Sequence, residues 1–248
     1  MSGVVRVETL EPGIVEVRID DPEGRNRMSD AVCDGLMDAL AGLRSDPELR
    51  VVLLAGRPDV FCAGAPLETL HRLAEGAVDV KDLHLSEGIL EFPLPVVGAL
   101  EGHAVGGGLM VALCCDLLVA AEGARYGVNF VDLGFTPGMG TTRLLPALAG
   151  PFPAAEMILT GTLFRGRDLQ GRGLFNRVVP ADQVWGAALD LALRIADKPR
   201  HVLEMLKLTL ALPRRKALQE AMTTEHLMHQ VCFGREETRA AVEAAYIR

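Results

Sequence analysis

The stretches Phe61-Cys62-Ala63-Gly64-Ala65 and Gly102-His103-Ala104-Val105-Gly106-Gly107-Gly108 decide how this chain of 248 residues is interpreted. Each follows a continuous apolar run of the kind that forms a strand buried on both faces. Glycine lets the backbone approach a ligand without a Cβ in the way, and a helix that begins at such a turn offers unpaired N–H groups. If the amides of Ala65 and Gly107 converge on one point, they form an oxyanion hole.

Outward from these two turns, apolar runs with strand periodicity alternate with runs of helical periodicity. Such alternation predicts parallel strands joined by right-handed crossovers, and Ser29 is placed to cap the first helix. Neither glycine turn has the Gly-Lys-Ser ending or the Gly-x-Gly-x-x-Gly spacing of a phosphate-binding loop. The strands are expected at residues 4–10, 14–19, 51–55, 96–100, 117–121 and 177–179.

From residue 141 onwards the sequence is almost wholly helical, and we expect breaks at Lys198-Pro199 and Leu212-Pro213 because proline interrupts helices. No internal repeat or low-complexity linker divides the chain. The sequence therefore predicts an α/β core domain over residues 1–195, followed by a helical C-terminal region over residues 196–248. That region packs either on the core or on a neighbouring subunit.

Composition excludes several classes of function. The formal net charge of −8 disfavours nucleic-acid binding, which needs clustered lysine and arginine. The five cysteines lack the paired spacing of a zinc site or a disulfide framework. No apolar run reaches the ~18–20 residues that span a membrane, and the first residues do not read as a signal peptide. We therefore expect a cytoplasmic protein without a metal site.

The two glycine stretches, together with Cys115-Asp116 and Gly134-Phe135-Thr136-Pro137-Gly138-Met139-Gly140, resemble the enoyl-CoA hydratase/isomerase (crotonase) family in motif and in order. The resemblance covers nearly the whole chain. It implies a spiral of ββα units with a helical C-terminal trimerisation region, hence a homotrimer. It also implies an acyl-thioester substrate, carried on coenzyme A or on the phosphopantetheine arm of an acyl carrier protein, and no further cofactor.

By the same resemblance, the amides of Ala65 and Gly107 polarise the thioester carbonyl, and Ala63, Ala65 and Gly106 contact the thioester ligand. Hydratases of this family use two glutamates to handle water and the α-proton. This chain has Met110 and Phe130 at those positions, and neither side chain transfers a proton. Asp132 lies two residues beyond Phe130, on the same face if the segment is a strand, and is the alternative acid.

Within the superfamily, residues 126–130, 134–140, 198–200 and 225–229 are most similar to the decarboxylases of polyketide β-branching cassettes. That subgroup implies conversion of a 3-methylglutaconyl to a 3-methylcrotonyl thioester, with a late histidine and a loop lysine taking part. His229 matches the histidine, with His226 as the fallback. Lys81 is the nearest match to the lysine, and His71 and Arg72 are the alternative positive groups.

Two other functions stay open at this point. One is hydration, dehydration or isomerisation of an acyl thioester, with Asp132 or His229 replacing the absent glutamates. The other is a catalytically silent subunit that binds acyl thioesters. Only the decarboxylase releases CO₂, so a product assay separates it from the hydratase or isomerase, whereas thioester binding without turnover would favour the silent subunit.

Overall fold

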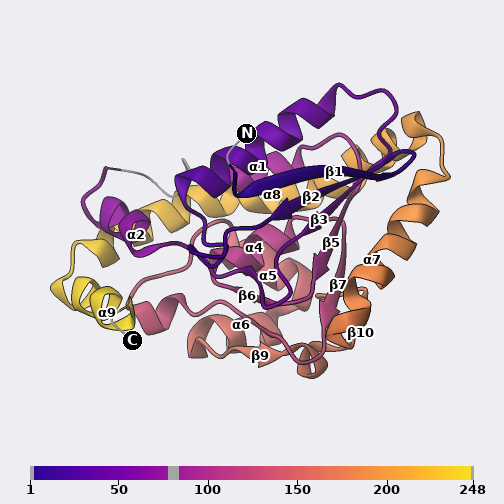
Figure 1. Cartoon of the computed structure of the whole chain (residues 1–248). Helices are drawn as coiled ribbons and strands as arrows, with labels where there is room; N and C mark the ends of the chain where they lie inside the picture. The colour runs from indigo at the N-terminus through magenta and orange to yellow at the C-terminus, as the bar shows by residue number, and fades with distance from the viewer. Residues whose placement is uncertain (1–2, 78–83, 247–248) are drawn as a thin grey trace.

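A computed structural model describes residues 3–77 and 84–246, and its main feature is a six-stranded sheet. The strands are β1 (Val5–Glu11), β2 (Ile14–Ile19), β3 (Val51–Ala55), β5 (Val96–Leu100), β7 (Leu117–Ala121) and β10 (Arg177–Val179). They lie in the order β1-β2-β3-β5-β7-β10 (Figure 1). β1 and β2 form an antiparallel hairpin, whereas all neighbours from β2 to β10 are parallel. The predicted hairpin and parallel strands are therefore confirmed.

A second sheet of very short strands holds the site. Its strands are β4 (Val60–Cys62), β6 (His103–Val105), β8 (Arg125–Gly127) and β9 (Phe164–Arg165), in that order. The pairs β4–β6 and β6–β8 are parallel. Because parallel neighbours end at the same edge of a sheet, the segments after β4, β6 and β8 are brought together there. Sequence periodicity did not predict this sheet, since two- and three-residue strands are too short to show any.

Helices surround the two sheets, and α7 packs along β3, β5 and β7. Ser29 Oγ accepts a 3.3 Å hydrogen bond from the Val32 amide and caps the first helix, as predicted. Both central strands β3 and β5 are buried along their whole length, which explains their continuous apolar sequences. The helices are α1 (Asp30–Arg44), α2 (Leu67–Ala74), α3 (Leu85–Leu90), α4 (Gly107–Leu113), α5 (Thr141–Ala149), α6 (Pro151–Thr160), α7 (Ala181–Ala196), α8 (Arg200–Phe233) and α9 (Glu236–Tyr246), with 3₁₀ turns η2 (Phe130–Leu133) and η3 (Gly166–Leu169).

The helix break predicted at Leu212-Pro213 is wrong, because α8 runs through Pro213. A proline inside a helix removes one hydrogen bond and adds a local clash, a penalty of about 3 kcal/mol that tertiary contacts can offset. Here Lys207 and Arg214 flank the proline, and each makes a 2.6 Å ion pair with Asp116. Arg214 Nη1 also donates to the Cys115 carbonyl at 2.6 Å. These buried contacts hold α8 to the core on both sides of Pro213.

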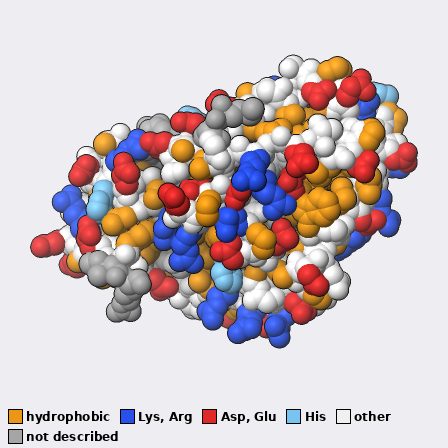
Figure 2. All heavy atoms as spheres, in the orientation of Figure 1, with side chains coloured by type: hydrophobic (Ala, Val, Ile, Leu, Met, Phe, Trp, Pro, Cys, Tyr) orange, Lys and Arg blue, Asp and Glu red, His pale blue; other side chains and the backbone are white. Residues whose placement is uncertain are grey.

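The C-terminal helices pack against the rest of the chain. α8 contacts α3 and α5, and α9 lies beside α2 and η2 (Figure 1). The division of the chain at residue 195 stays a prediction. None of the helices in the described ranges is long and apolar enough to cross a membrane. On the face drawn in Figure 2, basic side chains are interspersed with acidic and apolar ones.

Candidate active site

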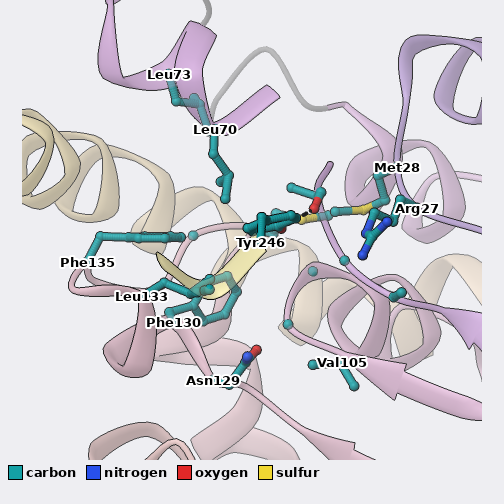
Figure 3. A pocket seen from close by; sticks show the side chains of 18 of the residues that line it. Arg27, Met28, Leu70, Leu73, Val105, Asn129, Phe130, Leu133, Phe135 and Tyr246 are labelled. Atoms are coloured by element: carbon teal, nitrogen blue, oxygen red, sulfur yellow. Dashed lines mark hydrogen bonds between the residues drawn. The ribbon is translucent and has the colours of Figure 1, made fainter. Parts of the chain in front are cut away.

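A cavity of about 220 Å³ lies where β4, β6 and β8 end. Its wall contains the turns after these strands, the loop before α5, and residues of α2, α8 and α9 (Figure 3). The candidate residues Ala63, Ala65, Gly106, Gly107 and His229 all line it. Five positions chosen from motif and order alone therefore meet around one space.

The hydrogen bonds made by two carbonyl groups determine how the candidate amides point. Gly64 O accepts a 2.9 Å bond from the Met28 amide, and Gly106 O accepts a 3.3 Å bond from the Met110 amide. In a trans peptide the N–H points away from the C=O. The N–H of Ala65 therefore points away from Met28, and the N–H of Gly107 points back out of the start of α4. Both carbonyls are bonded to protein, which leaves the two N–H directions for a ligand.

The two turns are packed directly against each other. A Cβ built on Gly64 would lie 3.0 Å from the Val105 carbonyl oxygen and 3.9 Å from the Gly107 nitrogen. Gly64 has φ +82°, which side-chain-bearing residues rarely adopt. Glycine at this position is therefore required both by backbone conformation and by the close approach of the second turn.

His229 lies on α8 with only 6% of its surface exposed. Its Nε2 is 2.6 Å from the Thr136 carbonyl oxygen. Since a carbonyl oxygen only accepts, Nε2 carries a proton. The ring is packed edge-on between Phe135 and Phe233, with centroids 5.7 and 5.5 Å away. His229 is thus an oriented imidazole that holds a proton at an apolar end of the cavity.

None of the described residues that line the cavity is acidic. Phe130 lines it, whereas Met110 is fully buried in the core. The prediction that Asp132 shares a face with Phe130 is wrong, because residues 130–133 form a 3₁₀ turn and not a strand. With three residues per turn, Phe130 and Leu133 share a face, and both line the cavity. Asp132 instead faces Gly161.

Among the described residues, the positive group that lines the cavity is neither of the two alternatives that the sequence offered beside Lys81. Lys81 lies outside the described residues. His71 and Arg72 do not line the cavity: His71 pairs with Glu243 at 2.6 Å, and Arg72 pairs with Asp30 at 2.7 Å. Arg27 does line it, and is the only lysine or arginine among the described lining residues. Sequence reasoning missed Arg27, since nothing in residues 25–28 distinguishes it from a surface arginine.

Tyr246, at the end of α9, is the second residue that sequence reasoning missed. Its Oη donates a 2.6 Å hydrogen bond to the Ala65 carbonyl oxygen, and the guanidinium of Arg27 lies 5.4 Å from its ring centroid. In Figure 3 it stands between Arg27 and Met28 on one side and Phe135 on the other. The contact spans 181 residues of sequence, so no local pattern indicates it.

The cysteine beside the first turn and the fallback histidine are not placed to act in the cavity. Burial raises the pKa of the Cys62 thiol, next to the first turn, to about 12, so it is protonated and a poor nucleophile near neutral pH. His226, the fallback histidine, does not line the cavity. Among the described residues, no group of three or more His, Cys, Asp or Glu side chains could hold a metal ion.

Comparison with known proteins agrees with this geometry. The sequence profile of the enoyl-CoA hydratase/isomerase family matches residues 9–246. This chain belongs to that family. It is 33% identical over 243 residues to the bacillaene synthase decarboxylase PksI of Bacillus subtilis, covering 98% of both chains. It is also 38% identical over 190 residues to a bovine mitochondrial enoyl-CoA hydratase domain-containing protein 2, covering 75% of this chain and 64% of the relative.

Solved structures of family members have the same fold. One comes from work on a dehydratase/decarboxylase enzyme couple in polyketide β-branching; it superposes with a TM-score of 0.95 at 33% identity, covering 98% of this chain and 99% of the other. The ECH2 decarboxylase domain of CurF from Lyngbya majuscula gives a TM-score of 0.91 at 34% identity, with the same coverage. The predicted crotonase fold and its likeness to β-branching decarboxylases are therefore confirmed, while the roles of individual residues stay predictions.

Proposed function

We propose that this protein is a carboxy-lyase that converts a 3-methylglutaconyl-type thioester into a 3-methylcrotonyl-type thioester in polyketide β-branching. The observation that carries the proposal is a cavity whose wall contains both amide turns, with no acidic side chain among its described lining residues. Two relatives that match nearly the whole chain, PksI and the ECH2 domain of CurF, are decarboxylases. Hydration would need titratable groups that position water, and Phe130 and Met110 supply none.

The reaction follows from the charge that each step creates. The bond between the carboxylate carbon and C4 breaks, CO₂ leaves, and the electron pair moves through C3 and C2 onto the thioester oxygen. The N–H groups of Ala65 and Gly107 bind that oxyanion, a contribution of roughly 3–4 kcal/mol for each such donor in acyl transfer. His229, as the imidazolium, then gives the proton on Nδ1 to C4, while the Nε2 proton stays on the Thr136 carbonyl; this leaves the C2–C3 double bond of the product and a neutral imidazole. The thioester is itself the electron sink, so the step needs no cofactor.

The lining of the cavity suits this charge movement. Phe130, Leu133 and Phe135 exclude water near His229, so the dienolate meets few competing proton sources. The absence of a carboxylate among the described lining residues also leaves the anionic substrate unopposed by a like charge. The Thr136 carbonyl keeps a proton on the His229 ring and fixes its orientation.

We also propose that the substrate is carried on acyl carrier protein or coenzyme A and that the protein forms a homotrimer. Large apolar side chains exposed on α6 and α8 support the assembly. They are Phe152, Leu159, Met205, Leu206, Leu208 and Leu210, each more than half exposed. Sedimentation analysis of the wild-type protein tests it, and a monomer at micromolar concentration would contradict it.

Mass spectrometry of the substrate thioester tests the function. Incubation of 3-methylglutaconyl thioester, on a carrier protein and on coenzyme A, is expected to remove one CO₂. His229→Ala is expected to lower the rate at least about 100-fold, in the range for loss of a general acid. His226→Ala is the matched control, because it lies one helical turn away on α8 outside the cavity. Unchanged substrate with wild type would contradict decarboxylation and favour a hydratase, isomerase or silent subunit.

A further inference from the structure

Tyr246 connects the C-terminal helix α9 to the first amide turn. Its hydroxyl donates to the Ala65 carbonyl oxygen at 2.6 Å, and the Arg27 guanidinium lies over its ring (Figure 3). Burial raises the pKa of the Tyr246 hydroxyl above its usual value, and the nearby charge of Arg27 opposes this only in part. The hydroxyl therefore stays protonated at neutral pH and acts as a hydrogen-bond donor.

The amide turn is held at two successive carbonyl groups by segments from opposite ends of the chain. The Met28 amide binds Gly64 O at 2.9 Å, and Tyr246 binds Ala65 O. The next residue, Pro66, has φ −72° and no N–H, and a residue before proline has a restricted backbone. The peptides on both sides of the Ala65 Cα are thus fixed, and with them the direction of the Ala65 N–H.

Two other contacts hold α9 over the cavity without touching the amide turn. Glu243 pairs with His71 on α2 at 2.6 Å, and Thr238 Oγ1 donates to the Gly134 carbonyl at 2.7 Å. The His71–Glu243 pair is exposed, with 44% and 51% of the side chains accessible, so it contributes little to stability. These contacts explain how α9 docks, but they do not explain why its last described residue carries a hydroxyl aimed at Ala65.

We propose that Tyr246 is a positioning residue for the Ala65 amide, which makes the docked C-terminal helix part of the oxyanion hole. This inference rests on the proposed function, because it needs an oxyanion to be bound at Ala65 and Gly107. A hydrogen-bond donor stabilises a transition-state charge best when its direction is fixed before the charge forms. Tyr246 supplies that fixation from the C-terminal end of the chain, and Arg27 stacks on the ring that carries the hydroxyl.

A purely structural role for Tyr246 gives a different result. If the ring only closes the cavity, its removal weakens binding but leaves the carbonyl of a bound ligand equally polarised. If the hydroxyl positions Ala65, its removal weakens the polarisation itself even when the site is full. The variant Tyr246→Phe keeps the ring and removes the hydroxyl, so it separates the two roles with little change in packing.

The test is infrared spectroscopy of bound 3-methylcrotonyl-CoA labelled with ¹³C at the thioester carbonyl. This compound lacks the carboxylate that leaves in the reaction, so it stays intact in the site. In wild type the carbonyl band is expected to move to lower frequency on binding. In Tyr246→Phe at saturation it is expected to return part of the way towards the free value. In turnover kcat is expected to fall about fivefold to tenfold, the effect of one hydrogen bond, with KM changed by less than about twofold.

Glu243→Gln is the matched control, since it removes the charge of the exposed His71–Glu243 pair on α9 without touching the amide turn, and its bound band is expected to match wild type. A wild-type band in Tyr246→Phe, or an effect on KM alone, would overturn the positioning role while leaving decarboxylation intact. A wild-type protein that shifts the band in a Tyr246-dependent way but releases no CO₂ would contradict the proposed reaction and support the positioning role. A wild-type band that does not move on binding would overturn both.

Discussion

Gly64 lies close enough to Gly107 that a Cβ on the first residue would be 3.9 Å from the backbone nitrogen of the second. This relationship joins two turns that are separated by more than forty residues in the sequence. It arises because β4 and β6 are parallel neighbours whose carboxyl ends share one edge. A change at either turn is therefore transmitted to the other.

We predict that Gly64→Ala lowers kcat at least about 100-fold, because the Ala65 donor is displaced from the oxyanion. The positive φ of +82° adds a strain of about 1–2 kcal/mol to the folded state. Gly76→Ala is the matched control, with φ +69° and no atom of the described residues within 4 Å of its Cβ. Denaturant unfolding and turnover are measured on both variants. Similar losses of activity in the two would contradict the role assigned to the first turn.

We predict that Phe130→Glu raises KM for the carboxylated thioester at least about tenfold, because a carboxylate beside the apolar lining of this cavity repels the substrate carboxylate. Phe130→Gln has nearly the same shape as Phe130→Glu but carries no charge, so comparing the two variants separates charge repulsion from the loss of packing by the phenyl ring. Steady-state kinetics with wild type and the two variants provides the comparison. Equal KM values for the glutamate and glutamine variants would show that the acyl carboxylate does not approach residue 130.

We predict that Asp116→Asn destabilises the fold by about 3–5 kcal/mol, because it leaves buried cations without their counter-charge. The Lys207 side chain is 2% exposed and the Arg214 side chain 14%, and both pair with Asp116. Asp197→Asn is the control: its pair with Lys198 is exposed, and such pairs contribute at most about 1 kcal/mol. Urea unfolding of both variants measures the difference, and equal free energies of unfolding would refute the prediction.

Glu225 gives the stability a predictable dependence on pH. Burial raises the pKa of this carboxyl, although bonds from Thr142 and Gly140 oppose the shift. In the interval between its ordinary and its raised pKa, folding takes up a proton. The free energy of unfolding of wild type, relative to Glu225→Gln, is therefore expected to increase as pH falls through that interval. Chemical denaturation across pH 4–8 measures it, and a difference that is constant with pH would contradict the raised pKa.

Much of the fold was predictable because its strands β1, β2, β3, β5 and β7 are long and continuously apolar or alternating. The two amide turns were predictable for a different reason, since glycine at Gly64 and Gly108 is needed where the backbones of the two turns approach each other closely. The 3₁₀ turn at 130–133 was not predictable from local pattern, and it reversed the expectation for Asp132. A strand and a 3₁₀ turn differ by the rotation per residue, which four residues are too few to reveal.

Contacts between segments that are distant in the sequence account for the remaining differences between the predicted and the observed structure. Arg27 and Tyr246 enter the site from the two ends of the chain, and nothing in their own neighbourhoods predicts that they meet. Pro213 continues a helix because Asp116, nearly one hundred residues earlier, anchors both of its flanks. Tertiary packing of this kind overrides the local preferences on which sequence reasoning depends.

The loops that follow the strands of the small sheet each carry a different part of the site. In the proposed reaction, the turns after β4 and β6 activate the thioester, whereas Phe130, which takes the place of a water-handling acid, follows β8. One loop can therefore diverge while its two neighbours conserve their geometry. Such a division of labour would allow a common ancestral scaffold to acquire a new reaction outcome through few substitutions, without first losing its affinity for activated acyl groups.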